Sequence, residues 1–112
     1  MEMKDALAAL SALAHETRLA AFRLLVPAGT GGVSAGVLAE RLAVPAPTLS
    51  FHLKELERAG LIEARREGRS ILYAARYPGM KAVLDFLVKD CCDGRPEICG
   101  FTAESCDAEP CA

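Results

Sequence analysis

Five cysteines lie in the last 22 residues of the chain, and they are the side chains best suited to bind a metal ion or to do redox chemistry. They occupy positions 91, 92, 99, 106 and 111, and the first 90 residues contain none. Cysteines confined to one segment cannot hold a whole fold together with disulfides. In a reducing cytosol, clustered thiols more often bind metal or act in redox reactions than form structural bridges. The sequence therefore predicts a thiol site attached to a domain that folds without it.

The composition predicts a single helical domain. The chain has 112 residues, of which 52% are hydrophobic and only 5% aromatic. Alanine and leucine are abundant, which favours helices over a β-sandwich. No apolar run approaches the roughly 18 residues that a membrane span needs. No secretory leader is visible either. We therefore expect a cytoplasmic protein with no membrane partner.

Charge is distributed unevenly along the chain. The formal net charge is −2, but residues 41–81 hold eight Lys or Arg against four Glu, a local charge of +4. Residues 91–112 hold one Arg against five acids. Because the field of a charged patch acts locally, the basic segment can bind phosphates despite the acidic total.

Hydrophobic spacing and capping residues predict five helices and one β-hairpin. Ser34 suits an N-cap, Pro47 suits the first turn of a helix, and Gly60 suits a helix end. Glu67-Gly68 suits a hairpin turn. The expected helices span residues 3–13, 15–27, 35–42, 48–59 and 78–89, and the expected strands span 61–66 and 69–75.

The order of these elements indicates a winged helix-turn-helix. The third and fourth helices are joined by a very short connection, and a hairpin follows at once. The predicted fold class is therefore mainly α with a β-hairpin wing. We assign residues 1–90 to this domain and residues 91–112 to a cysteine-rich tail.

The fourth helix and the hairpin carry the side chains expected to contact DNA. In a helix-turn-helix the second helix lies in the major groove, and a basic wing meets the backbone or a minor groove. Alternatively, Thr48 is only a helix cap, Ser50 an inert surface residue, and the hairpin arginines a solvated strand pair. The predicted DNA-binding residues are Thr48, Ser50, Phe51, His52, Lys54, Arg65, Arg66 and Arg69.

The segment Pro47–Ile62 resembles the recognition helix of ArsR-type winged-helix repressors. Leu13–Leu19 and Arg65–Tyr73 also resemble the corresponding family segments, and the similarity covers about residues 5–90. It implies a homodimer built from the first and last helices and bound to a pseudo-palindromic operator. Apolar stripes on those two helices supply an independent physical reason for a dimer.

Family members place their metal sites differently. Residues 34–42 contain no Cys, His or Asp, so the site of the founding arsenic repressors is absent. The last helix offers only Asp85 and no histidine, unlike the family's zinc sensors. Cys91, Cys92 and Cys99 resemble the thiols of arsenic repressors that bind beyond the last helix. The resemblance implies As(III) or Sb(III) as effector, release of DNA on binding, and no organic cofactor.

Coordination chemistry agrees with three thiolates but does not select one ion. As(III) favours a pyramid of three thiolates, whereas a structural zinc site wants four ligands. Soft thiolates alone cannot separate As(III) from other soft ions such as zinc, copper or cadmium. A disulfide from Cys99 to Cys91 or Cys92 would instead make a redox or persulfide sensor, and an idle tail also stays open. We expect Cys106 and Cys111 to be dispensable. No enzyme is expected. Even a small arsenate reductase needs a loop that binds its oxyanion, and the sequence shows no such loop.

Overall fold

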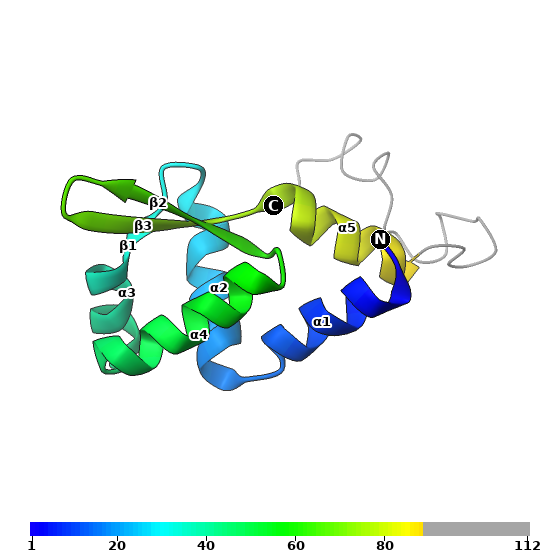
Figure 1. Ribbon diagram of the computed structural model, residues 1–112, viewed down its shortest axis with the longest axis horizontal. Helices are drawn as coiled ribbons and strands as arrows, with labels where there is room; N and C mark the ends of the chain where they lie inside the picture. The colour runs from blue at the N-terminus through cyan, green and yellow to red at the C-terminus, as the bar shows by residue number, and fades with distance from the viewer. Residues whose placement is uncertain (89–112) are drawn as a thin grey trace.

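The structure is a computed structural model that describes residues 1–88. Within that range it has five helices and one antiparallel sheet of three strands (Figure 1). The fold class expected from the sequence, mainly α with a β-hairpin wing, is confirmed. The elements follow in the order α1 (Met3–Leu13), α2 (Glu16–Ala28), β1 (Val33–Ser34), α3 (Ala35–Leu42), α4 (Ala46–Arg58), β2 (Ile62–Glu67), β3 (Ser70–Ala75) and α5 (Tyr77–Val88).

Local signals set most of the helix boundaries. The Ser34 hydroxyl accepts a hydrogen bond from the Val37 N–H at 3.3 Å and so caps α3 as expected. Helix α4 begins at Ala46, two residues before the expected position 48. Pro47 fits inside its first turn, where a missing N–H costs no hydrogen bond. Gly60, with a φ of 81°, follows the helix end as expected.

The sheet contains one strand that the sequence did not indicate. The order is β1-β3-β2, and both pairings are antiparallel. Strand β1 has only two residues, and Val33 pairs with Tyr73 of β3. Two residues are too few to show an alternating pattern, so this strand depends on its partner rather than on a local signal.

The hairpin turn lies one residue beyond the predicted position. Glu67 pairs with Ser70, which leaves Gly68 and Arg69 as the two-residue loop in place of Glu67-Gly68. Gly68 has a φ of 60°, the left-handed conformation that such a tight hairpin loop requires. The two strands therefore project as a short wing.

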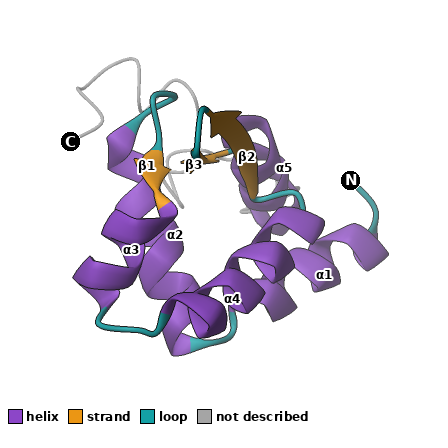
Figure 2. Ribbon diagram, turned by 60° about the vertical axis from the view of Figure 1, so that its left-hand side comes forward, coloured by secondary structure: helices purple, strands orange, loops and turns teal. Residues whose placement is uncertain are grey.

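The core lies between the sheet and the helices α2, α3 and α4 (Figure 2). Each leucine or isoleucine buried there contributes about 1.5–3 kcal/mol relative to exposure. The leucines of α4 recur at helical spacing, with polar residues between them, so one side of that helix packs against the core. The most fully buried side chains are Leu25, Leu38, Leu49, Leu53, Leu56, Leu61 and Ile62.

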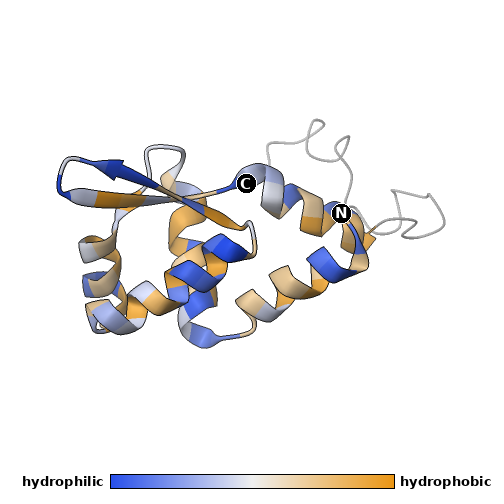
Figure 3. Cartoon of the chain, in the orientation of Figure 1, coloured by the Kyte–Doolittle hydropathy of each residue, from blue (hydrophilic) through white to orange (hydrophobic). Residues whose placement is uncertain are grey.

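Helices α1 and α5 lie together at the end of the molecule opposite the wing (Figure 1). Helix α5 spans Tyr77–Val88 rather than the expected 78–89. The Tyr77 hydroxyl donates a hydrogen bond to the Val26 carbonyl of α2, which anchors the start of α5. Both helices are largely apolar, whereas the outer half of β2 is hydrophilic (Figure 3). Among residues 1–88, every helix is too short or too polar to cross a lipid bilayer.

Candidate nucleic-acid interface

Helix α4 presents an exposed face of small polar, aromatic and basic side chains. Thr48, Ser50, Phe51 and Lys54 are exposed, while the intervening Leu49 is buried. Phe51 keeps 58% of its surface exposed, so its ring can be reached from solvent. These four predicted DNA-binding residues therefore share one accessible helix face.

His52 departs from the expectation that it contacts DNA. Its side chain is only 8% exposed and faces α2 rather than solvent. Nδ1 of His52 accepts a hydrogen bond from Nε of Arg18 at 3.1 Å, and its ring centroid lies 4.4 Å from that of His15. A side chain held in this way is not available to a base or a phosphate.

The sequence did contain a signal for this burial. His52 stands three residues after Leu49 and four before Leu56, so it falls on the apolar stripe of α4. The polar character of histidine predicts exposure, whereas its position on the helix predicts burial, and the position decides. Its partner Arg18 lies 34 residues earlier, and no local pattern connects the two.

The surroundings of His52 disfavour its protonated form. Burial lowers the pKa of His52 below the ordinary 6.5, and the nearby His15 and Arg18 lower it further. The hydrogen bond acts in the same direction, because only a neutral imidazole can accept a proton at Nδ1. His52 is therefore a neutral acceptor near pH 7.

The wing carries three exposed arginines, but they are not equivalent. The Arg65 guanidinium donates to the carbonyls of Thr30 at 3.4 Å and Gly31 at 3.2 Å, and it lies 3.4 Å from the Glu67 carboxylate. Arg65 therefore ties the wing to the loop between α2 and β1. Within residues 1–88, the side chains of Arg66 and Arg69 make no hydrogen bond or ion pair. Their guanidinium groups are available to phosphates.

Helix α4 contacts β2, the first strand of the wing. Helix α4 begins at the same end as the wing tip, far from α1 and α5 (Figure 1). A helix that projects hydroxyls and a flat aromatic ring, next to a strand pair that projects cations, has the features of a surface that enters a DNA groove.

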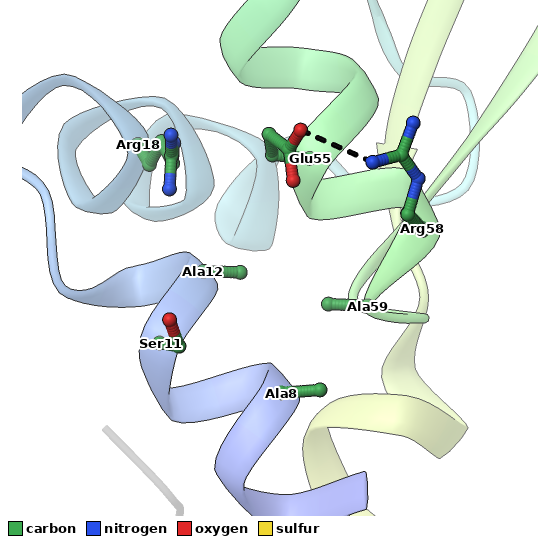
Figure 4. Close-up of a pocket in the computed structure, with 7 residues that line it drawn as sticks. All are labelled: Ala8, Ser11, Ala12, Arg18, Glu55, Arg58 and Ala59. Atoms are coloured by element: carbon green, nitrogen blue, oxygen red, sulfur yellow. Dashed lines mark hydrogen bonds and ion pairs between the residues drawn. The ribbon is translucent and has the colours of Figure 1, made fainter.

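A small cavity lies behind this surface, between α1, α2 and α4 (Figure 4). Its volume is about 250 Å³, and its floor is made of alanines. Arg58 lies 3.3 Å from Glu55 at its rim, and Arg18 lines its other side. None of the DNA-binding residues expected from the sequence lines it.

The expected thiol site lies outside the described residues. Cys91, Cys92 and Cys99 all follow residue 88, as do Cys106 and Cys111. Among residues 1–88, no three His, Cys, Asp or Glu side chains lie close enough together to hold a metal ion. The metal assignment therefore stays a prediction.

Comparison with known proteins places this arrangement among transcriptional regulators. A family model described as a helix-turn-helix domain matches residues 13–65. The transcriptional activator HlyU of Vibrio cholerae is 33% identical over 78 residues, which cover 70% of this chain and 69% of that protein. A biofilm growth-associated repressor of Agrobacterium fabrum is 39% identical over 64 residues, which cover 57% of this chain and 52% of that protein. The match thus spans about half the length of the second relative.

Solved structures agree on the fold. The structure of reduced HlyU from Vibrio cholerae has a TM-score of 0.63 and 31% identity, and the match covers 80% of this chain and 90% of that one. An ArsR-like transcriptional regulator from Rhodococcus sp. RHA1 has a TM-score of 0.68 and 24% identity, with 87% and 89% coverage. This second likeness supports the fold alone.

Proposed function

Because this chain belongs to the ArsR family of winged helix-turn-helix transcriptional regulators, we propose that it is a cytoplasmic repressor that binds double-stranded operator DNA as a homodimer. Binding of As(III) or Sb(III) by Cys91, Cys92 and Cys99 then releases the DNA. The relatives are named as regulators and not as enzymes, so no catalytic activity is proposed.

The observation that carries the DNA-binding part is the accessible face of α4 beside the wing. Thr48 and Ser50 can hydrogen-bond base edges or phosphates, and the Phe51 ring can contact a thymine methyl group. Lys54 and the free guanidinium groups of the wing supply the charge that phosphates require. Arg65 acts through the wing, which it holds in place.

The dimer is supported by apolar side chains that the rest of residues 1–88 leaves partly exposed. They occupy α1 and α5, which pack together at the end opposite the wing. Association would remove them from water at roughly 25 cal/mol per Å² of apolar surface. The side chains concerned are Met3, Leu7 and Leu10 of α1 and Leu84 and Leu87 of α5, each between 38% and 62% exposed.

The effector part rests on the chemistry of the donor set. Three thiolates match the preference of As(III), and Cys91 follows the last residue of α5 by three positions in the sequence. A ligand that draws Cys91, Cys92 and Cys99 together would act next to the helix proposed to form the dimer. Through that helix, effector binding would change the distance between the two recognition helices of the dimer.

A thiol redox or persulfide sensor is the second candidate. It would use the same cysteines without a metal ion. A structure of the relative HlyU is described as its reduced form, which favours keeping this candidate. A sensor of another soft metal ion stays open on the same ligands.

One experiment separates these readings. A duplex is first selected from a random library by the intact protein, and its gel shift is then measured with and without arsenite for the intact protein and for Cys99→Ser. The proposal predicts release by arsenite from the intact protein only. A stronger response to peroxide than to arsenite would favour the redox sensor. Failure to select any duplex would contradict the regulator itself.

A further inference from the structure

Apart from the phenol of Tyr73, His52 is the only buried polar or charged side chain among residues 1–88. It lies on α4 between Leu49 and Leu56, on the buried side of the helix and next to the accessible face. A polar group in that position costs free energy unless it is hydrogen-bonded, and the Arg18 Nε–H at 3.1 Å is its partner. The Arg18–His52 hydrogen bond therefore joins α2 to the helix proposed to read DNA.

Arg18 also contacts the accessible face. Its guanidinium carbon lies 5.9 Å from the centroid of the Phe51 ring, and that ring lies edge-on to His52 at 5.6 Å. One arginine thus holds both the buried and the exposed side of the first turns of α4. His15, whose Nδ1 accepts from the Thr17 N–H at 3.1 Å, fixes the start of α2 beside the same imidazole.

We propose that Arg18 and His52 are positioning residues that hold the recognition helix α4 in its DNA-binding orientation, and that protonation of His52 releases it. The inference rests on the proposed function, in which α4 reads DNA. A protonated imidazole has a donor on both nitrogens and cannot accept the Arg18 N–H. Two cations would then face each other across a hydrogen-bond distance in a partly buried site.

Groups on two helices bear on the charge of His52, and they do not all have the same sign. From α2 and its cap, Arg18 and His15 oppose a positive charge on the imidazole. On α4 itself Glu55, one turn later, lines the same cavity as Arg18. From α1 that cavity is lined only by alanines and Ser11, none of which titrates. Glu55 has the opposite sign, and its carboxylate is already 3.3 Å from Arg58. Glu16, in the first turn of α2 next to His15, is a second acid on a neighbouring element.

The direction of the pH effect distinguishes this role from direct contact. If His52 met a phosphate or a base acceptor, protonation would add a favourable charge, and DNA affinity would rise as pH falls. If His52 must stay neutral to hold α4, affinity falls instead. The loss approaches about tenfold per pH unit below the pKa of His52 in the free protein, for each protomer.

The test measures affinity for the selected duplex from about pH 7.5 to about pH 5, at constant salt. His52→Asn keeps an amide oxygen near the position of Nδ1 but cannot take a proton. We expect it to bind within about threefold of the wild type at the upper pH and to lose the pH dependence. The matched control, His15→Asn, keeps the cap on α2 and removes the neighbouring ring. It should keep the pH dependence and move its midpoint to higher pH, because His15 lowers the pKa of His52.

A second measurement uses the wild-type protein without DNA. Nitrogen-detected NMR of the imidazoles should show an unprotonated Nδ1 on His52 near neutral pH. Amide exchange in α4 should then lose protection below the pKa of His52 by a larger factor than in α3. This measurement decides the role of the Arg18–His52 pair even if no duplex is selected, which would contradict only the proposed function.

The inference is overturned by wild-type affinity that stays constant or rises as pH falls. It is equally overturned by a His52→Asn variant with the pH dependence of the wild type. A protection of α4 that does not change with the protonation of His52 would have the same consequence.

Discussion

Gly79 in the first turn of α5 is packed so closely against Gly60 that a single methyl group should displace the helix. A Cβ built at Gly79 would lie 2.0 Å from the Gly60 carbonyl oxygen and 3.2 Å from the Gly60 carbonyl carbon. An ordinary carbon–oxygen contact is more than about 3 Å, so α5 or the α4–β2 connection must move by roughly an ångström. The neighbour is backbone and cannot rotate away.

The magnitude follows from two opposing terms. Overpacking in a close contact of this kind costs about 1–3 kcal/mol, and a clash with backbone belongs at the upper end. Alanine in place of glycine within a helix returns at most about 1 kcal/mol. We therefore expect Gly79→Ala to lower the free energy of unfolding by about 1–2 kcal/mol.

The control is Gly36→Ala in α3, where an added Cβ would meet nothing within 4 Å. That variant should gain up to about 1 kcal/mol, because helix propensity acts without a clash. Urea unfolding followed by circular dichroism, at one protein concentration, measures both. If the Gly79→Ala variant were as stable as the Gly36→Ala variant, Gly79 could not be in close contact with Gly60, and α5 would have to lie elsewhere.

Three further outcomes follow from the same structure. Arg66→Ala combined with Arg69→Ala should weaken binding to all duplexes alike and flatten the salt dependence of that binding. Ser50→Ala combined with Phe51→Ala should instead cost about 1–3 kcal/mol per lost base contact, on the selected duplex only. Competition titrations at several salt concentrations separate the two patterns. Leu87→Glu should yield monomers in analytical ultracentrifugation and lose duplex affinity, and a wild-type monomer at micromolar concentration would contradict the dimer. Because folding lowers the pKa of His52, the stability that the neutral imidazole contributes is complete above about pH 6.5 and is lost as pH falls from 6.5 toward the folded pKa. Urea titrations should show this loss in the wild type and not in His52→Asn. The same pH profile of stability in both proteins would contradict this prediction.

Local signals explain why most of the fold was predictable. Ser34, Pro47 and Gly60 act through their own backbone and side-chain chemistry, so their roles are the same in the sequence and in the structure. The leucines of α4 follow the helical period, and they are buried as expected. Features of this kind need no knowledge of distant residues.

The features that were missed depend on distant partners. Val33 is in a strand only because it pairs with Tyr73, which lies far along the chain. The hairpin turn moved by one residue because the register of Glu67 with Ser70 fixes the loop. The chemical type of His52 predicts a DNA contact, whereas the structure has its side chain buried and hydrogen-bonded to Arg18.

The candidate DNA-binding site was predictable only where it depends on local signals. The helical period predicts the accessible face, because it puts the buried leucines on one side of α4. Thr48, Ser50, Phe51 and Lys54 then lie on the other side. The distinction between Arg65 and the other wing arginines could not be predicted, since it depends on carbonyls of the loop before β1.

The central claim is that a thiol site beyond α5 controls DNA binding by α4 and the wing. The most direct measurement is fluorescence anisotropy of the selected duplex during an arsenite titration, on the wild type and on a variant with both Cys91→Ser and Cys92→Ser. Both proteins should bind alike without arsenite. Arsenite should weaken the wild type by about 5- to 150-fold, the range of a coupling free energy of about 1–3 kcal/mol, and leave the variant unchanged. A variant that still responds to arsenite, or a wild type that does not, would contradict the account.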